Sequence, residues 1–224
     1  MKKIIAIVLA VSSLFFLTVS NALAEWSAGI SVAHGVYRAD ATETQEGDGE
    51  KNSTTGKVGQ FTYPSIFLEY NLGRVSVGFD VIPGSVTTEE SSRTDINIGI
   101  SNGVGNDGVL AGVTNKASVE LSRHVSLYAL VPIMDIGAFA RIAVMRVDVE
   151  TKEALNTGSK YPDTHMTGAS LSLGYQHDTD AVFIRAEVGY TDYEGISVTS
   201  SNTANKVDAD VDGAWARISI GKTF

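Results

Sequence analysis

His124 and Ser126 have the residue types of a general base and a nucleophile. They stand two positions apart, so in an extended strand their side chains share one face. A histidine placed there could take the proton of the serine hydroxyl, but the chemistry also needs a third, acidic group that orients the imidazole. The alternation of the segment turns both residues to the same side as Glu120, and no surrounding residues strengthen the catalytic interpretation. We therefore expect no catalytic role for the pair.

Three glycines, Gly103, Gly105 and Gly108, have the spacing of a dinucleotide-binding fingerprint. That fingerprint needs a preceding strand and a following helix in a crossover unit, and the sequence predicts neither. Together with Asp107 the stretch also resembles one calcium-binding nonapeptide, but such repeats act in stacked arrays and this chain has one copy. The composition instead predicts a glycine-rich loop without a cofactor.

A third group of polar residues is an acidic stretch that contains only two lysines, Lys51 and Lys57. Carboxylate oxygens are the ligands that Ca²⁺ and Mg²⁺ prefer, so the stretch could share the divalent ions that bridge lipopolysaccharide. The simpler interpretation is a solvated loop whose charges repel one another. The acidic residues are Asp40, Glu43, Glu46, Asp48 and Glu50.

The first 24 residues have the organisation of an export signal. Lys2 and Lys3 precede an apolar run at 4–19, and Ala22 and Ala24 form a small-x-small cleavage site. This pattern predicts cleavage after Ala24 and a single domain at 25–224. The apolar run is shorter than the roughly 20 residues that a membrane-spanning helix needs.

Composition excludes several classes of function. The chain has 17 Lys and Arg residues against 26 Asp and Glu residues, a formal net charge of −9 at pH 7, which disfavours nucleic-acid binding. It has no cysteine, which rules out disulfides and thiolate metal sites. We expect no cofactor and no metal site.

Period-two alternation of apolar and polar residues fills the rest of the chain and predicts β-strands. Residues 169–176 alternate, 182–190 alternate again, and the four residues between them form an aspartate-rich turn, so the pair is a hairpin. The same test along the chain predicts eight strands, at 26–38, 59–72, 74–83, 116–132, 138–150, 166–177, 181–193 and 211–224.

The connections between these strands alternate in length. Short turns are expected at 72–74, 133–137 and 178–180, and long polar loops at 39–58, 84–115, 151–165 and 194–210. Short turns on one side and long loops on the other are typical of transmembrane β-barrels. The fold class predicted is therefore all-β, an eight-stranded antiparallel up-and-down transmembrane β-barrel with four long surface loops and three short periplasmic turns.

Side-chain type assigns the two faces of the strands. The apolar faces suit lipid, and the other faces carry mainly Ser, Gly and Thr with isolated charges, as a narrow interior requires. Isolated charges there would be costly, so we expect the arginines to bridge the carboxylates and to plug the barrel. The predicted interior network is Glu69, Asp80, Glu120, Arg141, Arg185, Glu187 and Arg217. In an alternative interpretation, Glu69 and Glu120 lie at the barrel rims and are solvated.

The chain resembles the small outer membrane β-barrel superfamily that includes the transmembrane domain of outer membrane protein A, protein X and the opacity proteins. Members end in an aromatic residue on an alternating strand, and Phe224, Ile220 and Ile218 match that assembly signal, whereas Lys222 departs from it. The resemblance implies an outer membrane location, contact with lipid and lipopolysaccharide, and recognition by the barrel assembly machinery and periplasmic chaperones. It implies a monomer.

Aromatic residues toward the strand ends predict girdles at the membrane interfaces. The girdle residues expected are Trp26, Tyr70, Tyr190, Tyr193, Trp215 and Phe224.

The first functional hypothesis is a structural or surface-interaction barrel that is not an enzyme, and the second is a narrow small-solute channel. A lipid-modifying enzyme is the third, because His124 and Ser126 resemble the His-x-Ser motif of the outer membrane lipid A deacylases. A soluble ligand-binding barrel is the fourth.

Overall fold

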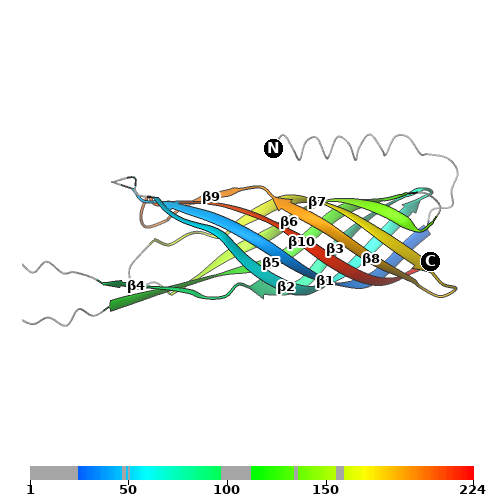
Figure 1. Ribbon diagram of the computed structural model, residues 1–224, viewed down its shortest axis with the longest axis horizontal. Coiled ribbons are helices and arrows are strands. Elements are labelled where there is room, and N and C mark those ends of the chain that lie inside the picture. Colours follow the sequence, from blue (N-terminus) through cyan, green and yellow to red (C-terminus); the bar gives the residue numbers. More distant parts are fainter. Residues whose placement is uncertain (1–24, 47–48, 50, 97–111, 134–135, 155–158) are drawn as a thin grey trace, which may run out of the picture.

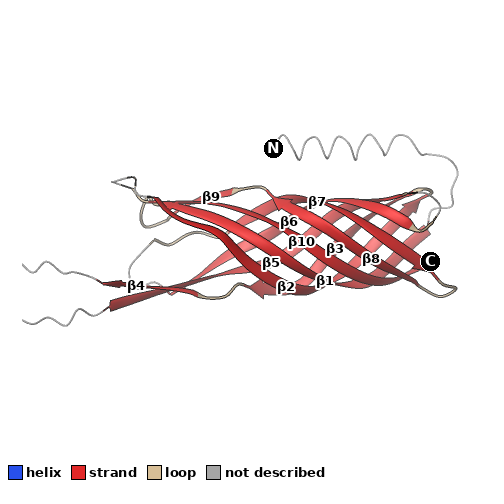
Figure 2. Cartoon of the chain, viewed as in Figure 1, coloured by secondary structure: helices blue, strands red, loops and turns tan. Residues whose placement is uncertain are grey.

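The computed structural model describes residues 25–224 apart from 47–48, 50, 97–111, 134–135 and 155–158. The predicted cleavage residues Ala22 and Ala24, the glycine-rich stretch with Asp107, and Asp48 and Glu50 lie outside the described residues. The described part of the chain folds into strands joined by loops, with no helix (Figure 2). Among these residues, then, no helix is long and apolar enough to cross a membrane.

Eight antiparallel strands pair in sequence to form a closed ring, and the last strand pairs with the first (Figure 1). Two short additional strands, β4 (Ser91–Ile96) and β9 (Ile196–Thr199), pair with β5 and β10 outside the ring. The ring is built from β1 (Glu25–Thr44), β2 (Lys51–Leu72), β3 (Val75–Thr87), β5 (Gly112–Pro132), β6 (Ala138–Ala154), β7 (Thr164–Asp178), β8 (Phe183–Tyr193) and β10 (Lys206–Thr223). The prediction of an eight-stranded antiparallel barrel is confirmed.

The strands extend further at one end of the barrel than the alternation predicts. The ends at the three short turns agree with prediction to within about two residues, as expected for boundary assignment. At the opposite end β1 continues to Thr44, and β2 begins already at Lys51, so most of the predicted loop at 39–58 is strand. These extensions are polar on both faces, so they lack the alternation that marks a half-buried strand. Figure 1 places β4 and β9 toward this end and the C-terminus at the other.

The outer face of the barrel changes from apolar to polar along β6. In its first half Ile142 and Val144 point outward, while Arg141 points inward and is 3% exposed. In its second half Arg146 points outward and Val147 inward. Lipid requires apolar side chains on the outside, whereas water favours apolar side chains on the inside. The change on the outer face therefore marks where the lipid-facing belt ends and the water-facing extension begins.

The belt itself is a set of exposed aliphatic side chains on the part of each strand that is nearer the short turns. Their exposure would be unfavourable in water and is what a bilayer requires, so this part of the barrel spans a membrane. The belt includes Ile30, Val32, Ile66, Leu127, Leu171, Leu173, Val188, Ile218 and Ile220.

Aromatic residues flank the belt, although two of the six predicted ones do not. Trp26 and Tyr70 lie together near the short turns, with ring centroids 4.8 Å apart, and Tyr190 and Phe224 also point outward. Trp215 and Tyr193 are corrections to the prediction, because their positions in the alternation turn them inward. The Trp215 indole is 6% exposed and donates a hydrogen bond to the Thr191 hydroxyl at 3.0 Å.

Candidate functional site: the interior charge network

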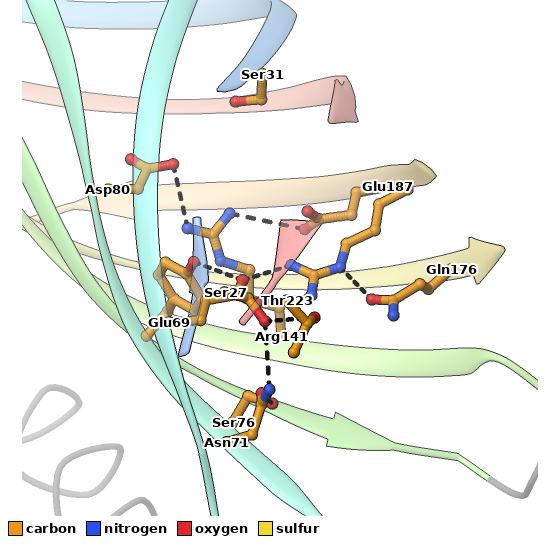
Figure 3. Close-up of polar contacts among 12 residues, drawn as sticks. Ser27, Ser31, Glu69, Asn71, Ser76, Asp80, Arg141, Gln176, Glu187 and Thr223 are labelled. Carbon is orange, nitrogen blue, oxygen red and sulfur yellow. Dashed lines mark hydrogen bonds and ion pairs between the residues drawn. The ribbon is translucent and has the colours of Figure 1, made fainter. Parts of the chain in front are cut away.

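Six of the seven predicted interior charges lie together in the lumen of the belt. Five strands supply them, and on each strand they occupy the inward set of the alternation. Figure 3 shows four of them, Glu69, Asp80, Arg141 and Glu187, gathered in the interior. The full set is Glu69 on β2, Asp80 on β3, Arg141 on β6, Arg185 and Glu187 on β8, and Arg217 on β10.

The Glu69 carboxylate is the most deeply buried of these groups, with no exposed area. Its Oε2 accepts a hydrogen bond from Arg185 Nη2 at 2.7 Å, and its Oε1 accepts one from Arg185 Nη1. The Tyr128 hydroxyl also donates to Oε1 at 2.7 Å. The guanidinium of Arg185 lies 4.3 Å from the ring centroid of Phe183, a cation–π contact. This two-pronged pairing satisfies a carboxylate that could not otherwise be buried.

Asp80 forms a second centre with two arginines. Its Oδ2 lies 2.8 Å from Arg217 Nη1 and 3.4 Å from Arg141 Nη2. The hydroxyls of Ser65 and Ser126 donate to the two carboxylate oxygens at 3.1 and 3.0 Å. Charge and hydrogen bonds together therefore compensate the burial of this carboxylate.

Arg141 links the second centre to Glu187. Arg141 Nη1 lies 3.7 Å from Glu187 Oε2, and the guanidinium carbon lies 3.8 Å from the ring centroid of Tyr128, whose hydroxyl bonds Glu69. Three carboxylates thus face three arginines, and their formal charges cancel.

A smaller polar cluster lies in the interior near the short turns. The hydroxyls of Ser27 and Thr223 are 2.9 Å apart, and the Asn71 amide donates to Ser27 Oγ at 3.3 Å. The Ser76 hydroxyl donates to Asn71 Oδ1 at 2.6 Å. These contacts join strands β1, β2, β3 and β10 at the end of the barrel (Figure 3).

Glu120 does not join the network, and a β-bulge is the reason. Arg123 and His124 both stand opposite Val147, and Arg123 adopts a positive φ of 48°. A bulge inserts one residue, so the inward and outward positions exchange beyond it. Glu120 therefore points outward, beside Glu150 of β6, and both carboxylates contact Lys152 Nζ, at 3.2 and 2.7 Å.

The structure places His124 and Ser126 inside the barrel, away from lipid. The Ser126 hydroxyl donates a hydrogen bond to Asp80 Oδ1, and His124 Nε2 lies 3.4 Å from the Tyr193 hydroxyl. No described contact joins the imidazole to the serine. A serine that donates to a buried carboxylate of an ion-pair network is not arranged as a base-activated nucleophile.

The acidic residues of the predicted loop 39–58 are dispersed among other partners. Asp40 accepts hydrogen bonds from Arg38 and from the backbone N–H of Gly56, and the hydrogen bond of Gly56 is the main reason that the pKa of Asp40 is lowered. Glu43 accepts from the Tyr161 hydroxyl at 2.6 Å. Within the part of the chain that the structure describes, no group of acidic or histidine residues could hold a metal ion.

The predicted assembly residues lie on one outward face of β10. Ile218 and Ile220 are exposed to lipid, and Phe224 continues the same alternation with 72% of its surface exposed. The backbone N–H of Phe224 donates to the Trp26 carbonyl at 2.7 Å, which ties the C-terminal residue to β1. Lys222 Nζ lies 5.6 Å from the Phe224 ring centroid.

Comparison with solved structures identifies the same architecture. OprG from Pseudomonas aeruginosa aligns with a TM-score of 0.51 and 14% sequence identity, over 88% of this chain and 95% of its own. The chain has the fold of the small outer membrane β-barrels. Together, this fold and the apolar belt show a barrel that spans a membrane.

Two further barrels match with lower TM-scores. The outer membrane protein AlkL, solved in DMPC bilayers, has a TM-score of 0.48 at 14% identity and 92% coverage of both chains. Neisserial surface protein A has a TM-score of 0.36 at 12% identity, over 84% of this chain and 96% of its own. No protein-family model and no curated protein sequence matches the chain.

Proposed function

We propose that the protein is a closed outer membrane barrel with a structural or surface-interaction role, and that it conducts no solutes. The interior network supports this proposal, because its three carboxylates and three arginines satisfy one another across the lumen. Opening a water-filled path would require these ion pairs to separate in a narrow interior. Ser126 takes part in the same network, so we propose no enzymatic activity at this residue.

The outer ends of the strands support the surface role, because contacts between separate loops hold them together. Asn205 Nδ2 donates to Glu43 Oε1 at 3.3 Å and to the Ser159 hydroxyl at 2.9 Å. The Ser201 N–H donates to the Lys160 carbonyl at 2.8 Å. The outer end of β1 and the segments before β7 and after β9 thus form one connected outer surface, which we propose binds partners.

We propose lipopolysaccharide as one partner of the barrel wall. Arg123 and Arg146 lie where the outer face changes from apolar to polar, and both contact Asp148. Their side chains are 77% and 59% exposed, so their guanidinium groups are accessible to phosphate. For biogenesis, we propose that periplasmic chaperones and the barrel assembly machinery recognise the outward face that carries Ile218, Ile220 and Phe224. We also propose that the assembled protein is a monomer.

Single-channel recording tests whether the barrel is closed. Purified protein inserted into planar lipid bilayers is expected to give no steady conductance, because the ion-pair network blocks the lumen. The double substitution R141A/E187A removes one charge of each sign together with two large interior side chains, and it is expected to produce conducting events. The matched control K116A/E90A removes an exposed pair at the outer end and should stay silent. Steady ohmic conductance of the wild-type protein would instead support the channel hypothesis.

Cysteine labelling tests which end of the barrel is displayed at the cell surface. The chain has no cysteine, so a single introduced thiol gives an unambiguous signal. In intact cells a membrane-impermeant maleimide is expected to label E90C, at the long-loop end, and not R74C, in an exposed short turn. Both variants should be labelled after the outer membrane is permeabilised. Labelling of R74C alone in intact cells would reverse the proposed orientation.

A further inference from the structure

Two exposed arginines lie at the outer edge of the lipid-facing belt on the neighbouring strands β5 and β6. Arg146 of β6 stands opposite Val125 of β5, and Arg123 lies in the bulge of β5, opposite Val147. A bulge re-aims the side chain of the residue that it inserts, and Arg123 projects from the outer wall. On these two strands the arginines are the first charged side chains that point outward beyond the belt.

One carboxylate holds both guanidinium groups in place. Arg123 Nη2 lies 2.5 Å from Asp148 Oδ2, and Arg146 Nε lies 3.6 Å from Asp148 Oδ1. Two positive charges therefore share one negative charge, which leaves the three residues with a net positive charge. Among the described contacts, none engages Nη1 or Nη2 of Arg146. The outer edge of this guanidinium is thus available to the oxygens of an anion.

The arginines lie between an apolar and an acidic zone of the same wall. On the side of the belt, the outward pair Val144 and Leu127 comes directly before Arg146 and Val125 along the two strands. On the outer side Glu150 follows four residues after Arg146, about 13 Å along an extended strand, and it contacts Lys152 Nζ at 2.7 Å. A phosphate group that is attached to acyl chains matches this order, because its chains can lie on the aliphatic residues while its oxygens reach the arginines.

The opposite wall of the barrel presents charges of the other sign. In the order of the ring, β10 and β1 lie across from β5 and β6. The first charged residues that β8 and β10 present outward beyond the belt are Asp192 and Asp212, which stand opposite each other in the ladder. On β1 the corresponding residue is Arg38, whose Nη2 lies 2.8 Å from Asp40 Oδ2. Carboxylates repel a phosphate, so its recognition is confined to the side of β5 and β6.

We propose that Arg123 and Arg146 bind one phosphate group of a lipopolysaccharide molecule directly, with no divalent cation between protein and lipid. The inference rests on the proposed contact between the barrel wall and lipopolysaccharide, and it adds the mode of recognition. Between lipid molecules, divalent cations bridge phosphate groups that would otherwise repel one another. At this wall two guanidinium groups replace the cation, and each can donate parallel hydrogen bonds to two phosphate oxygens. The lipid bound here therefore stays on the barrel when divalent cations are removed.

Native mass spectrometry of the folded protein, released from detergent micelles after titration with lipid A in EDTA, counts the lipids that stay bound. Wild-type protein is expected to retain one lipid A molecule per barrel. Lipid A from which the phosphates have been removed has the same acyl chains and should bind at least tenfold more weakly. R146Q should weaken binding of lipid A about tenfold, and R123N/R146Q about a hundredfold. Asparagine is chosen at position 123 because it tolerates the positive φ of the bulge.

The matched control is R38Q, which removes an exposed arginine from the opposite wall and should bind lipid A as the wild type does. A heat-dependent shift on a gel verifies that each variant is folded, and R146Q alone decides if the double variant does not fold. Equal binding of lipid A by wild type and R123N/R146Q would overturn direct recognition. Binding by the wild type in Mg²⁺ but not in EDTA would also overturn it, while the proposed contact with lipopolysaccharide would stand. Absence of binding in both conditions would remove that contact as well.

Discussion

Replacing Glu69 with alanine is expected to lower the free energy of unfolding by about 3–5 kcal/mol. The substitution leaves the Arg185 guanidinium buried without its carboxylate, and it also removes the acceptor of the Tyr128 hydroxyl. Gln176 still accepts a hydrogen bond from Arg185, but it carries no charge. Urea-induced unfolding in detergent micelles, followed by the mobility shift between folded and unfolded protein, measures the loss.

The matched control is E90A, which removes a carboxylate of similar type from an exposed ion pair. Glu90 and Lys116 are 54% and 49% exposed, so water replaces the lost partner. E90A should unfold at the same urea concentration as the wild type. If E69A and E90A unfolded together, Glu69 would not be a buried member of the network.

Replacing Asp80 with alanine is the second large effect that we expect, again about 3–5 kcal/mol. Asp80 is the shared acceptor of Arg141 and Arg217, so its removal leaves two guanidinium groups without their common carboxylate. Arg141 keeps its contact with Glu187, whereas Arg217 loses its one described carboxylate partner. The unpaired charge of Arg217 should therefore account for most of the lost stability.

A double-mutant cycle tests this assignment. Adding R217M to D80A removes the unpaired charge and keeps a long apolar side chain beside Trp215, so the double variant should recover about 1–3 kcal/mol of the loss. The same urea titration compares the wild type, both single variants and the double variant. Strict additivity of D80A and R217M would contradict a direct coupling between the two side chains.

Much of the membrane-spanning part could be predicted from sequence. There the alternation is strict, because lipid on one side and a narrow lumen on the other impose opposite requirements on neighbouring positions. Trp215 and Arg217 are two positions apart on β10, so the alternation that places Arg217 inside also places Trp215 inside. The girdle assignment of Trp215 therefore contradicted the alternation. Tyr193 on β8 follows the same rule with Arg185 and Glu187. In these two cases the position in the alternation predicts the face of the strand better than the residue type does.

The outer part could not be predicted in the same way. Beyond the belt the outer face becomes polar, as Arg146 shows, so the rule that apolar side chains point outward no longer holds there. The bulge at Arg123 exchanges the inward and outward positions of β5 on its outer side. No residue type at that site predicts the bulge. Glu120 was assigned to the wrong face for this reason. A cavity of about 100 Å³ in the outer part of the lumen could not be anticipated either, because its wall combines residues of all eight ring strands.

The pairing of β1 with β10 also has a consequence for how the chain reaches its folded state. The side chains of Ser27 and Thr223 meet although 196 positions separate them in sequence. Closing a chain segment of this length costs about 5 kcal/mol of conformational entropy before any contact repays it. Every other ring pairing joins two ring strands that follow one another along the chain. The junction of β1 and β10 is therefore the natural last step of assembly. Until it forms, the nascent sheet has two unpaired edges that are open to aggregation.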